Sequence, residues 1–288
     1  ADHAVILPIL LPFAAGIGLL LMPPGAAARR LSLAAVAALL SLAVLLMLTT
    51  DGGDRFYALG GWPAPFGITL ALDRLSALLL LLTALVALPA LCYAISTNLD
   101  RQGRFFHPLF QFQLMGLNGA FLTGDLFNLF VFFEILLMAS YSLLIQGGGR
   151  ERIRASLHYV ILNLTGSALF LIAIGVLYGL TGALNLAELA TRIAAAPAAD
   201  AGLLRAAAGL LLVVFGLKAA ILPLYCWLPA AYANTSASVA ALFALLTKVG
   251  VYSMIRVFPL AFGPEFTGWL LPLGLATLLA GSMGVLAS

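Results

Sequence analysis

The sequence predicts an all-α fold, a polytopic transmembrane helical bundle of about nine spans. Three observations support this prediction. Hydrophobic residues make up 63% of the 288 residues and charged residues only 9%, whereas an ordinary soluble domain has about 25% charged residues. Apolar runs of about 20 residues, long enough to cross a ~30 Å hydrocarbon core as helices, recur along the chain. Most arginines lie between these runs, as topology signals do.

The apolar runs define the expected spans in chain order. They cover residues 4–22, 31–50, 74–97, 108–124, 126–146, 153–180, 203–231, 236–258 and 268–288. The seventh run contains Pro223 and Pro229. Because proline removes a backbone donor and clashes with the preceding turn, we expect a discontinuous seventh helix that breaks at Pro223. Broken backbone at membrane depth is tolerated where it is buried or lines a water-filled cavity.

Two connecting segments have signals of their own. Segment 51–73 contains Gly-Gly and two prolines, Pro63 and Pro65, which predicts an external loop with a short hairpin. Segment 184–200 carries Glu188 and Arg192 among alanines and leucines, which predicts a short helix lying at the membrane interface.

The arginines predict the orientation of the bundle. They cluster in the loops after the first, third and fifth runs, at Arg29, Arg30, Arg101, Arg104, Arg150, Arg152 and Arg154. The loops after the second, fourth and eighth runs are poorer in arginine. Because basic loops stay in the cytoplasm, we expect the N-terminus outside.

Composition and motifs exclude several classes of protein. The net charge of +3 does not indicate a nucleic-acid partner, because the basic residues are dispersed between apolar runs. Cys92 and Cys226 are too few for a metal or disulfide framework, and their apolar surroundings predict buried thiols. The chain has no GxxxxGK[ST], CxxC, HExxH or GxSxG motif. We therefore expect no cofactor and no metal site.

Three charged residues lie near the middle of apolar runs: Glu134 in the fifth, Lys218 in the seventh and Lys248 in the eighth. A charge at the centre of a spanning helix costs about 2.5–3.5 kcal/mol on insertion scales. Burial favours the neutral form of each group and an opposite charge favours the ionised form. A Glu134–Lys218 pair can therefore take up and release a proton as its contact forms and breaks, and Lys248 offers the next site. The alternative, side chains that reach the interface, fits the short stem of Glu134 poorly.

Three further residues are secondary candidates for a proton path. His158 begins the sixth run, and it suits either a proton relay or an interfacial histidine. Tyr252 lies one turn beyond Lys248 on the same run. Asp125 lies directly before the fifth run, as a helix cap or as part of a vestibule.

With these residues in place, the chain resembles the antiporter-like membrane subunits shared by respiratory NADH:quinone oxidoreductase and Mrp-type multisubunit Na⁺/H⁺ antiporters. The matching segments are 62–80, 118–144, 215–232 and 241–258. Complex I subunits typically carry histidine at the positions of Tyr225 and Tyr232, and tryptophan at that of Phe133. These departures make the chain look like the D-type member of the Mrp branch.

The resemblance implies a division of the chain into three parts. Residues 1–106 would hold the first three helices and the external loop, and 107–258 a complete five-helix repeat. Residues 259–288 would begin a second, inverted repeat, truncated where this sequence ends.

The resemblance also implies a function. The chain would be a proton-translocating subunit of a multisubunit Na⁺/H⁺ antiporter in the bacterial plasma (inner) membrane, with Glu134, Lys218 and Lys248 on the proton path. Its partners would be other membrane subunits, lipid and protons, with Na⁺ bound by this chain or by another subunit. Two alternatives stay open: a proton-pumping subunit of NADH:quinone oxidoreductase, which is an enzyme complex, and a non-conducting scaffold.

Overall fold

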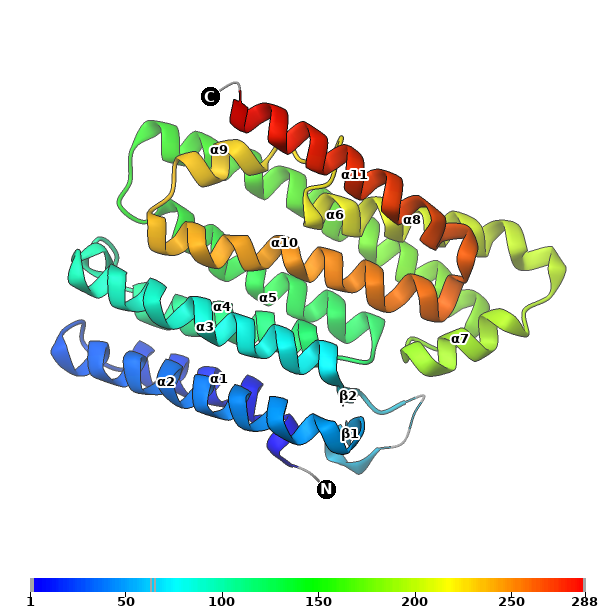
Figure 1. Cartoon of the computed structure of the whole chain (residues 1–288), viewed down its shortest axis with the longest axis horizontal. Coiled ribbons are helices and arrows are strands. Elements are labelled where there is room, and N and C mark those ends of the chain that lie inside the picture. Colours follow the sequence, from blue (N-terminus) through cyan, green and yellow to red (C-terminus); the bar gives the residue numbers. More distant parts are fainter. Residues whose placement is uncertain (1–2, 63, 65, 287–288) are drawn as a thin grey trace.

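The computed structural model describes residues 3–62, 64 and 66–286, and helices dominate it (Figure 1). The predicted helical character is therefore confirmed, whereas Pro63, Pro65 and the end of the ninth predicted span lie outside the described residues. The principal elements are α1 (Leu7–Leu20), α2 (Ala26–Thr49), β1 (Arg55–Ala58), β2 (Thr69–Leu72), α3 (Arg74–Ser96), η4 (Leu99–Arg101), α4 (Phe106–Leu122), α5 (Leu126–Ile145), α6 (Arg150–Thr181), α7 (Leu186–Ala194), α8 (Ala201–Ala219), α9 (Leu228–Ala233), α10 (Ala237–Val257), η6 (Phe258–Phe262) and α11 (Pro264–Leu286).

Seven of the described helices are long and apolar enough to cross a membrane. They are α2, α3, α5, α6, α8, α10 and α11. The first and fourth predicted spans form the shorter helices α1, of 14 residues, and α4, of 17 residues. The chain is thus a multi-span membrane protein by helix length and composition, and the predicted total of about nine spans stays a prediction.

The two ends of the bundle differ. The turns α1–α2, α3–α4 and α5–α6 lie at one end, and the hairpin and α7 lie at the other (Figure 1). The hairpin pairs β1 and β2 antiparallel, with Arg55 opposite Leu72 and Ala58 opposite Thr69. Asn185 caps α7, because its side chain accepts hydrogen bonds from the backbone of Ala187 and Glu188. The hairpin and the short helix predicted from sequence are both confirmed.

The seventh predicted span is broken in the structure. Helix α8 ends at Ala219 and α9 begins at Leu228, and the Leu222–Pro223 peptide bond between them is cis. Ala220 takes the left-handed conformation, with φ 55°, and the Ile221 amide donates back to Gly216 at 3.0 Å. The indole Nε1 of Trp227 donates to the Leu217 carbonyl at 2.9 Å, so carbonyls freed by the break have partners.

Two glycines let neighbouring helices approach the end of α8 closely. A Cβ added at Gly250 of α10 would lie 2.8 Å from the Lys218 carbonyl carbon. A Cβ at Gly166 of α6 would lie 2.7 Å from a methyl carbon of Leu217. Real Cβ atoms essentially never come so near, because interiors are close-packed. The backbone around Lys218 is therefore held between α6 and α10.

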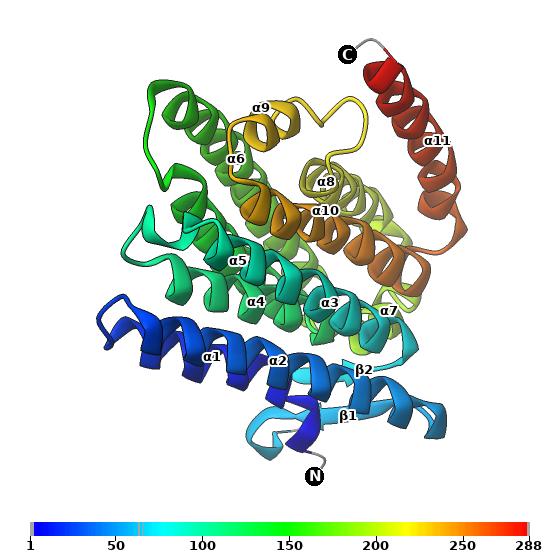
Figure 2. The same cartoon turned by 60° about the vertical axis from the view of Figure 1, so that its left-hand side comes forward.

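Burial varies strongly between helices. In the most apolar stretch of α10 and η6, 67% of residues are buried, whereas the corresponding value for α11 is 0%. Helix α11 lies along one side of the bundle (Figure 2). It is joined there by a hydrogen bond from the Leu222 amide to Thr277 Oγ1 at 2.9 Å.

The prediction of buried thiols is wrong. Cys92 and Cys226 are both exposed on the surface of the protein. In a protein surrounded by water, an apolar run predicts buried side chains. In a membrane protein the lipid-facing side of a spanning helix is apolar as well, so an apolar run does not show which side chains are buried.

Candidate functional site

Lys218 is the most deeply buried charge among those predicted from sequence. It lies one residue before the end of α8 and its side chain is enclosed, with the residue 3% exposed. Its Nζ donates to the Asn163 carbonyl at 3.2 Å and to Ser167 Oγ at 3.0 Å, both on α6. The ammonium also lies 5.6 Å from the centre of the Phe133 ring on α5, within the range of a cation–π contact.

Glu134 reaches the same hydroxyl from α5. The Ser167 hydroxyl donates a hydrogen bond to Glu134 Oε1, and the glutamate is half-buried. Within the described ranges no ion pair joins Glu134 directly to Lys218; Ser167 connects them. Sequence reasoning expected the two charges to meet and did not find this serine, because a serine in an apolar run looks the same whether it satisfies its own helix or bridges two charges.

The three side chains form a continuous donor–acceptor series. The ammonium donates to the hydroxyl and the hydroxyl donates to the carboxylate. A coordinated shift of two protons along this series neutralises both charges without moving a heavy atom far. The arrangement can therefore hold a proton at either end and pass it through Ser167.

A tyrosine near Glu134 has a buried hydroxyl without a hydrogen-bond partner among the described residues. This residue is Tyr141, two turns further along α5. Its ring packs against Tyr159 of α6 at a centroid distance of 5.1 Å, and Tyr159 in turn shares a hydrogen bond of 2.8 Å with Ser140. Tyr141 also lines a cavity of about 440 Å³ between α5 and α6. Polar groups thus continue from Glu134 toward the α5–α6 turn.

Lys248 is exposed on α10, on the face that carries Ala244 and Val251. Its Nζ contacts only its neighbour Thr247 among the described residues, through a hydrogen bond of 3.4 Å to Oγ1. Lys248 therefore lies on a face of α10 that the described helices leave open, and its place on a proton path stays a prediction. An apolar run does not reveal which face of a helix its neighbours cover, and the buried face of α10 carries Val249 and Gly250 instead.

Tyr252 belongs to a different network, at the hairpin end of the bundle. Its hydroxyl donates to the Phe121 carbonyl at 2.8 Å and accepts from Arg256 Nε at 3.1 Å. The Arg256 guanidinium forms a two-pronged ion pair with Asp73, at 2.5 and 2.8 Å. Burial alone would raise the pKa of Asp73, but hydrogen bonds from Arg256 and Ser76 lower that pKa to about 2. This network ties α3 to α10.

The other two secondary candidates lie apart from Lys218. His158 is exposed on α6 and lines a small cavity of about 220 Å³ with Glu151 and Asn234. Asp125 caps α5, since its carboxylate accepts from the Asn128 amide at 2.8 Å. Burial raises the pKa of Asp125 by more than its backbone hydrogen bonds lower it. Among the residues described, no group of three His, Cys, Asp or Glu side chains gathers to hold a metal ion.

The chain matches the family model described as NADH:quinone oxidoreductase/Mrp antiporter, TM, over residues 123–288. It is 50% identical to the D subunit of a probable K⁺/H⁺ antiporter of Rhizobium meliloti, over 82% of this chain and 45% of that protein. It is 43% identical to the D subunit of the Na⁺/H⁺ antiporter of Bacillus subtilis, over 99% of this chain and 59% of that protein. The chain thus spans about half the length of these relatives.

A solved structure shares the fold. The Mrp complex from Dietzia sp. DQ12-45-1b contains a chain that superimposes with a TM-score of 0.80 at 32% identity, over 91% of this chain and 50% of that one.

Proposed function

Because the chain belongs to the NADH:quinone oxidoreductase/Mrp antiporter family of membrane subunits, we propose that it is a proton-translocating subunit of a multisubunit monovalent cation/proton antiporter. The observation that carries the proposal is the buried Lys218, joined through the Ser167 hydroxyl to Glu134. A buried ionisable group inside a membrane protein is expensive and marks ion pathways.

The proposed mechanism begins at the Glu134–Ser167–Lys218 series. A proton that arrives at Glu134 neutralises the carboxylate and removes the charge that stabilises the Lys218 ammonium. The lysine then releases its proton, and the exposed Lys248 on the neighbouring helix receives it. The proton on Glu134 then passes through the Ser167 hydroxyl to the neutral Lys218, which restores the carboxylate and the ammonium and leaves one proton transferred to Lys248.

The direction of entry follows from the predicted orientation. The α5–α6 turn, with its arginines, is the cytoplasmic end. Tyr141 and its cavity lie between that turn and Glu134, so protons would enter from the cytoplasm along the α5–α6 boundary. Cation movement would be coupled to this transfer by partner subunits in the plasma membrane, and we propose that Lys248 delivers the proton to a second repeat beginning at 259–288.

The two branches of the family differ in the process that is coupled to proton movement, which is cation exchange in one and redox chemistry in the other. The relatives named above are antiporter subunits, one named for K⁺ and one for Na⁺. At Tyr225, Tyr232 and Phe133 the chain departs from the pattern that complex I subunits typically carry. Both features favour the antiporter over an NADH:quinone oxidoreductase.

The test uses the full-length subunit co-expressed with its complex, in everted vesicles from cells that lack their own antiporters. Addition of Na⁺ or K⁺ should dissipate an imposed pH gradient, as reported by a pH-sensitive dye. Glu134→Ala should abolish the response while the complex still assembles. Glu188→Gln is the matched control, because Glu188 forms a half-exposed ion pair with Arg192 on α7, at 3.4 Å.

Three outcomes separate the alternatives. Dissipation by either cation that Glu134→Ala abolishes supports the antiporter. Proton pumping that needs NADH and co-purified redox subunits would identify the complex I branch. Full antiport activity of the Glu134→Ala variant would contradict a role in proton transfer and would support a non-conducting scaffold.

A further inference from the structure

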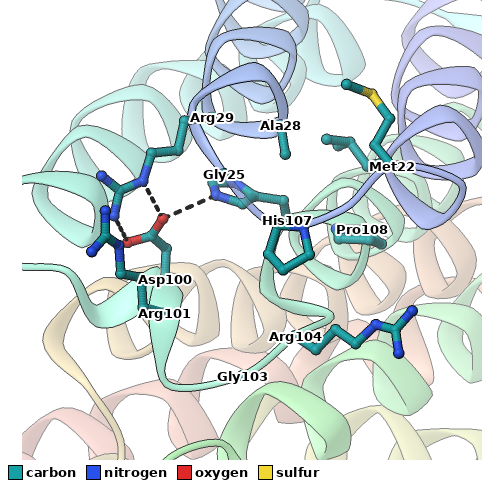
Figure 3. Close-up of a pocket in the computed structure, with 12 residues that line it drawn as sticks. Met22, Gly25, Ala28, Arg29, Asp100, Arg101, Gly103, Arg104, His107 and Pro108 are labelled. Atoms are coloured by element: carbon teal, nitrogen blue, oxygen red, sulfur yellow. Dashed lines mark hydrogen bonds and ion pairs between the residues drawn. The ribbon is translucent and has the colours of Figure 1, made fainter.

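A cavity lies at the end of the bundle formed by the α1–α2 turn, η4 and the start of α4 (Figure 3). Its volume is about 410 Å³. None of its lining residues belongs to the Glu134–Ser167–Lys218 series, and the proposed function does not use the cavity. The residues that line it are Leu19, Met22, Pro24, Gly25, Ala28, Arg29, Asp100, Arg101, Gly103, Arg104, His107 and Pro108.

The acidic group of this cavity is already paired. Asp100 is 7% exposed, and its carboxylate accepts from Arg29 Nε at 2.6 Å and from a second Arg29 nitrogen at 2.7 Å. His107 Nε2 lies 3.2 Å from the same carboxylate (Figure 3). The negative charge of Asp100 is therefore compensated by Arg29, and no further arginine is paired with this carboxylate among the described residues.

Two arginines at the cavity are free. Arg101 and Arg104 are exposed, and neither side chain makes a hydrogen bond or an ion pair within the described ranges. Arg104 extends away from the Asp100 carboxylate (Figure 3) and lies over the Phe105 ring, at 5.3 Å. The lining therefore carries an excess of positive charge.

The lining also offers a buried polar atom that nothing in the described chain satisfies. His107 is 6% exposed, and its Nδ1 has no hydrogen-bond partner among the described residues. A buried polar group without a partner is costly. In the neutral ring, when Nε2–H donates to Asp100, Nδ1 is an acceptor that remains for a hydroxyl of a ligand.

The remaining wall is apolar, formed by Leu19, Met22, Pro24, Ala28 and Pro108. A cavity with arginines on one side and aliphatic groups on the other fits an amphiphilic anion. Its position, where spanning helices end, is the depth of lipid headgroups, and basic pockets between such helices bind anionic headgroups. We propose that this cavity binds the phosphate of an anionic phospholipid through Arg101 and Arg104, with the glycerol and upper acyl carbons against the apolar wall.

The test measures lipid retention by native mass spectrometry on the full-length subunit in its purified complex. The complex is exchanged into detergent with equal amounts of phosphatidylglycerol and phosphatidylcholine. The double variant Arg101→Gln/Arg104→Gln should retain phosphatidylglycerol roughly tenfold to thirtyfold less than the wild type, because each arginine near a membrane surface contributes about 1 kcal/mol. Neither side chain has a hydrogen-bond or ion-pair partner in the described fold, so the variant should assemble normally.

The matched control is Arg150→Gln/Arg154→Gln, which removes two exposed arginines from the same end of the bundle, outside the cavity. This control should retain phosphatidylglycerol as the wild type does, and phosphatidylcholine should be lost from all three proteins. Equal retention by the wild type and the Arg101/Arg104 variant would overturn the proposal, as would an equal loss in the control. Displacement of the lipid by excess inorganic phosphate would also overturn it, because it would show an anion site that makes no use of the apolar wall.

Discussion

At the scale of single residues, the site depends on one hydroxyl. Ser167 accepts from Lys218 and donates to Glu134, so it transmits any change of charge between them. The sequence predicted the importance of these two charged residues, because an ionised group in an apolar run is costly and is retained where it has a function. It did not predict Ser167, whose importance arises only when α5, α6 and α8 are packed together.

Ser167→Ala should therefore slow antiport by about tenfold or more, since it leaves a buried ammonium and a carboxylate each short of a hydrogen bond, a loss of about 1–3 kcal/mol. Ser167→Thr keeps the hydroxyl and should retain most of the activity. The measurement is the initial rate of cation-dependent dye response in vesicles with equal amounts of assembled complex. An alanine variant as fast as the threonine variant would show that the hydroxyl does not carry the proton.

Asp73 and Arg256 provide a residue-scale prediction about pH. The pKa of Asp73 is lowered to about 2 in the folded chain, so the carboxylate stabilises the fold fully above its ordinary pKa of about 4. That stabilisation is lost as the pH falls from about 4 to 2. Asp73→Asn should lower the melting temperature of the detergent-solubilised subunit at neutral pH, and the gap from wild type should narrow below about pH 4. A gap that is constant across this range would contradict the ion pair.

At the scale of elements, the break between α8 and α9 places Lys218. Pro223 predicted the discontinuity, and the structure has it. The helix nonetheless ends before the proline, at Ala219, because Ala220 turns left-handed and Trp227 satisfies the Leu217 carbonyl. Those partners come from packing, which local sequence signals do not contain.

The close approach of α10 to α8 is a testable part of this arrangement. Gly250→Ala should destabilise the subunit by about 1–3 kcal/mol, as overpacking does, because its Cβ would collide with backbone at Lys218 and Ala219. Gly175→Ala is the control, since a Cβ at Gly175 of α6 meets nothing within 4 Å. Thermal unfolding of both variants checks the prediction. Equal melting temperatures would mean that α10 does not press on the end of α8.

At the scale of the whole molecule, composition and the apolar runs predicted the helical membrane fold. They could not predict how fully each helix is covered. Helix α10 is mostly buried while α11 is not, and Lys248 lies on the face of α10 that the described helices leave open. Burial of a spanning helix depends on its neighbours rather than on its own composition.

The predicted orientation is also a property of the whole molecule. In a Cys92→Ser/Cys226→Ser background, Arg150→Cys should react with a membrane-impermeant maleimide only from the cytoplasmic side. Asp54→Cys, in the segment before β1, should react only from outside. The reverse pattern would invert the topology and place proton entry at the opposite face.

The central claim is that Glu134 and Lys218 work as one proton-transfer unit. The most direct measurement is cation-dependent proton transport by the reconstituted full-length complex, carrying Glu134→Gln, Lys218→Ala or both. We predict that each single variant loses transport and that the double variant is no slower than either, because residues that act as a unit are not additive. Full transport by either single variant, or losses that multiply in the double variant, would contradict the account.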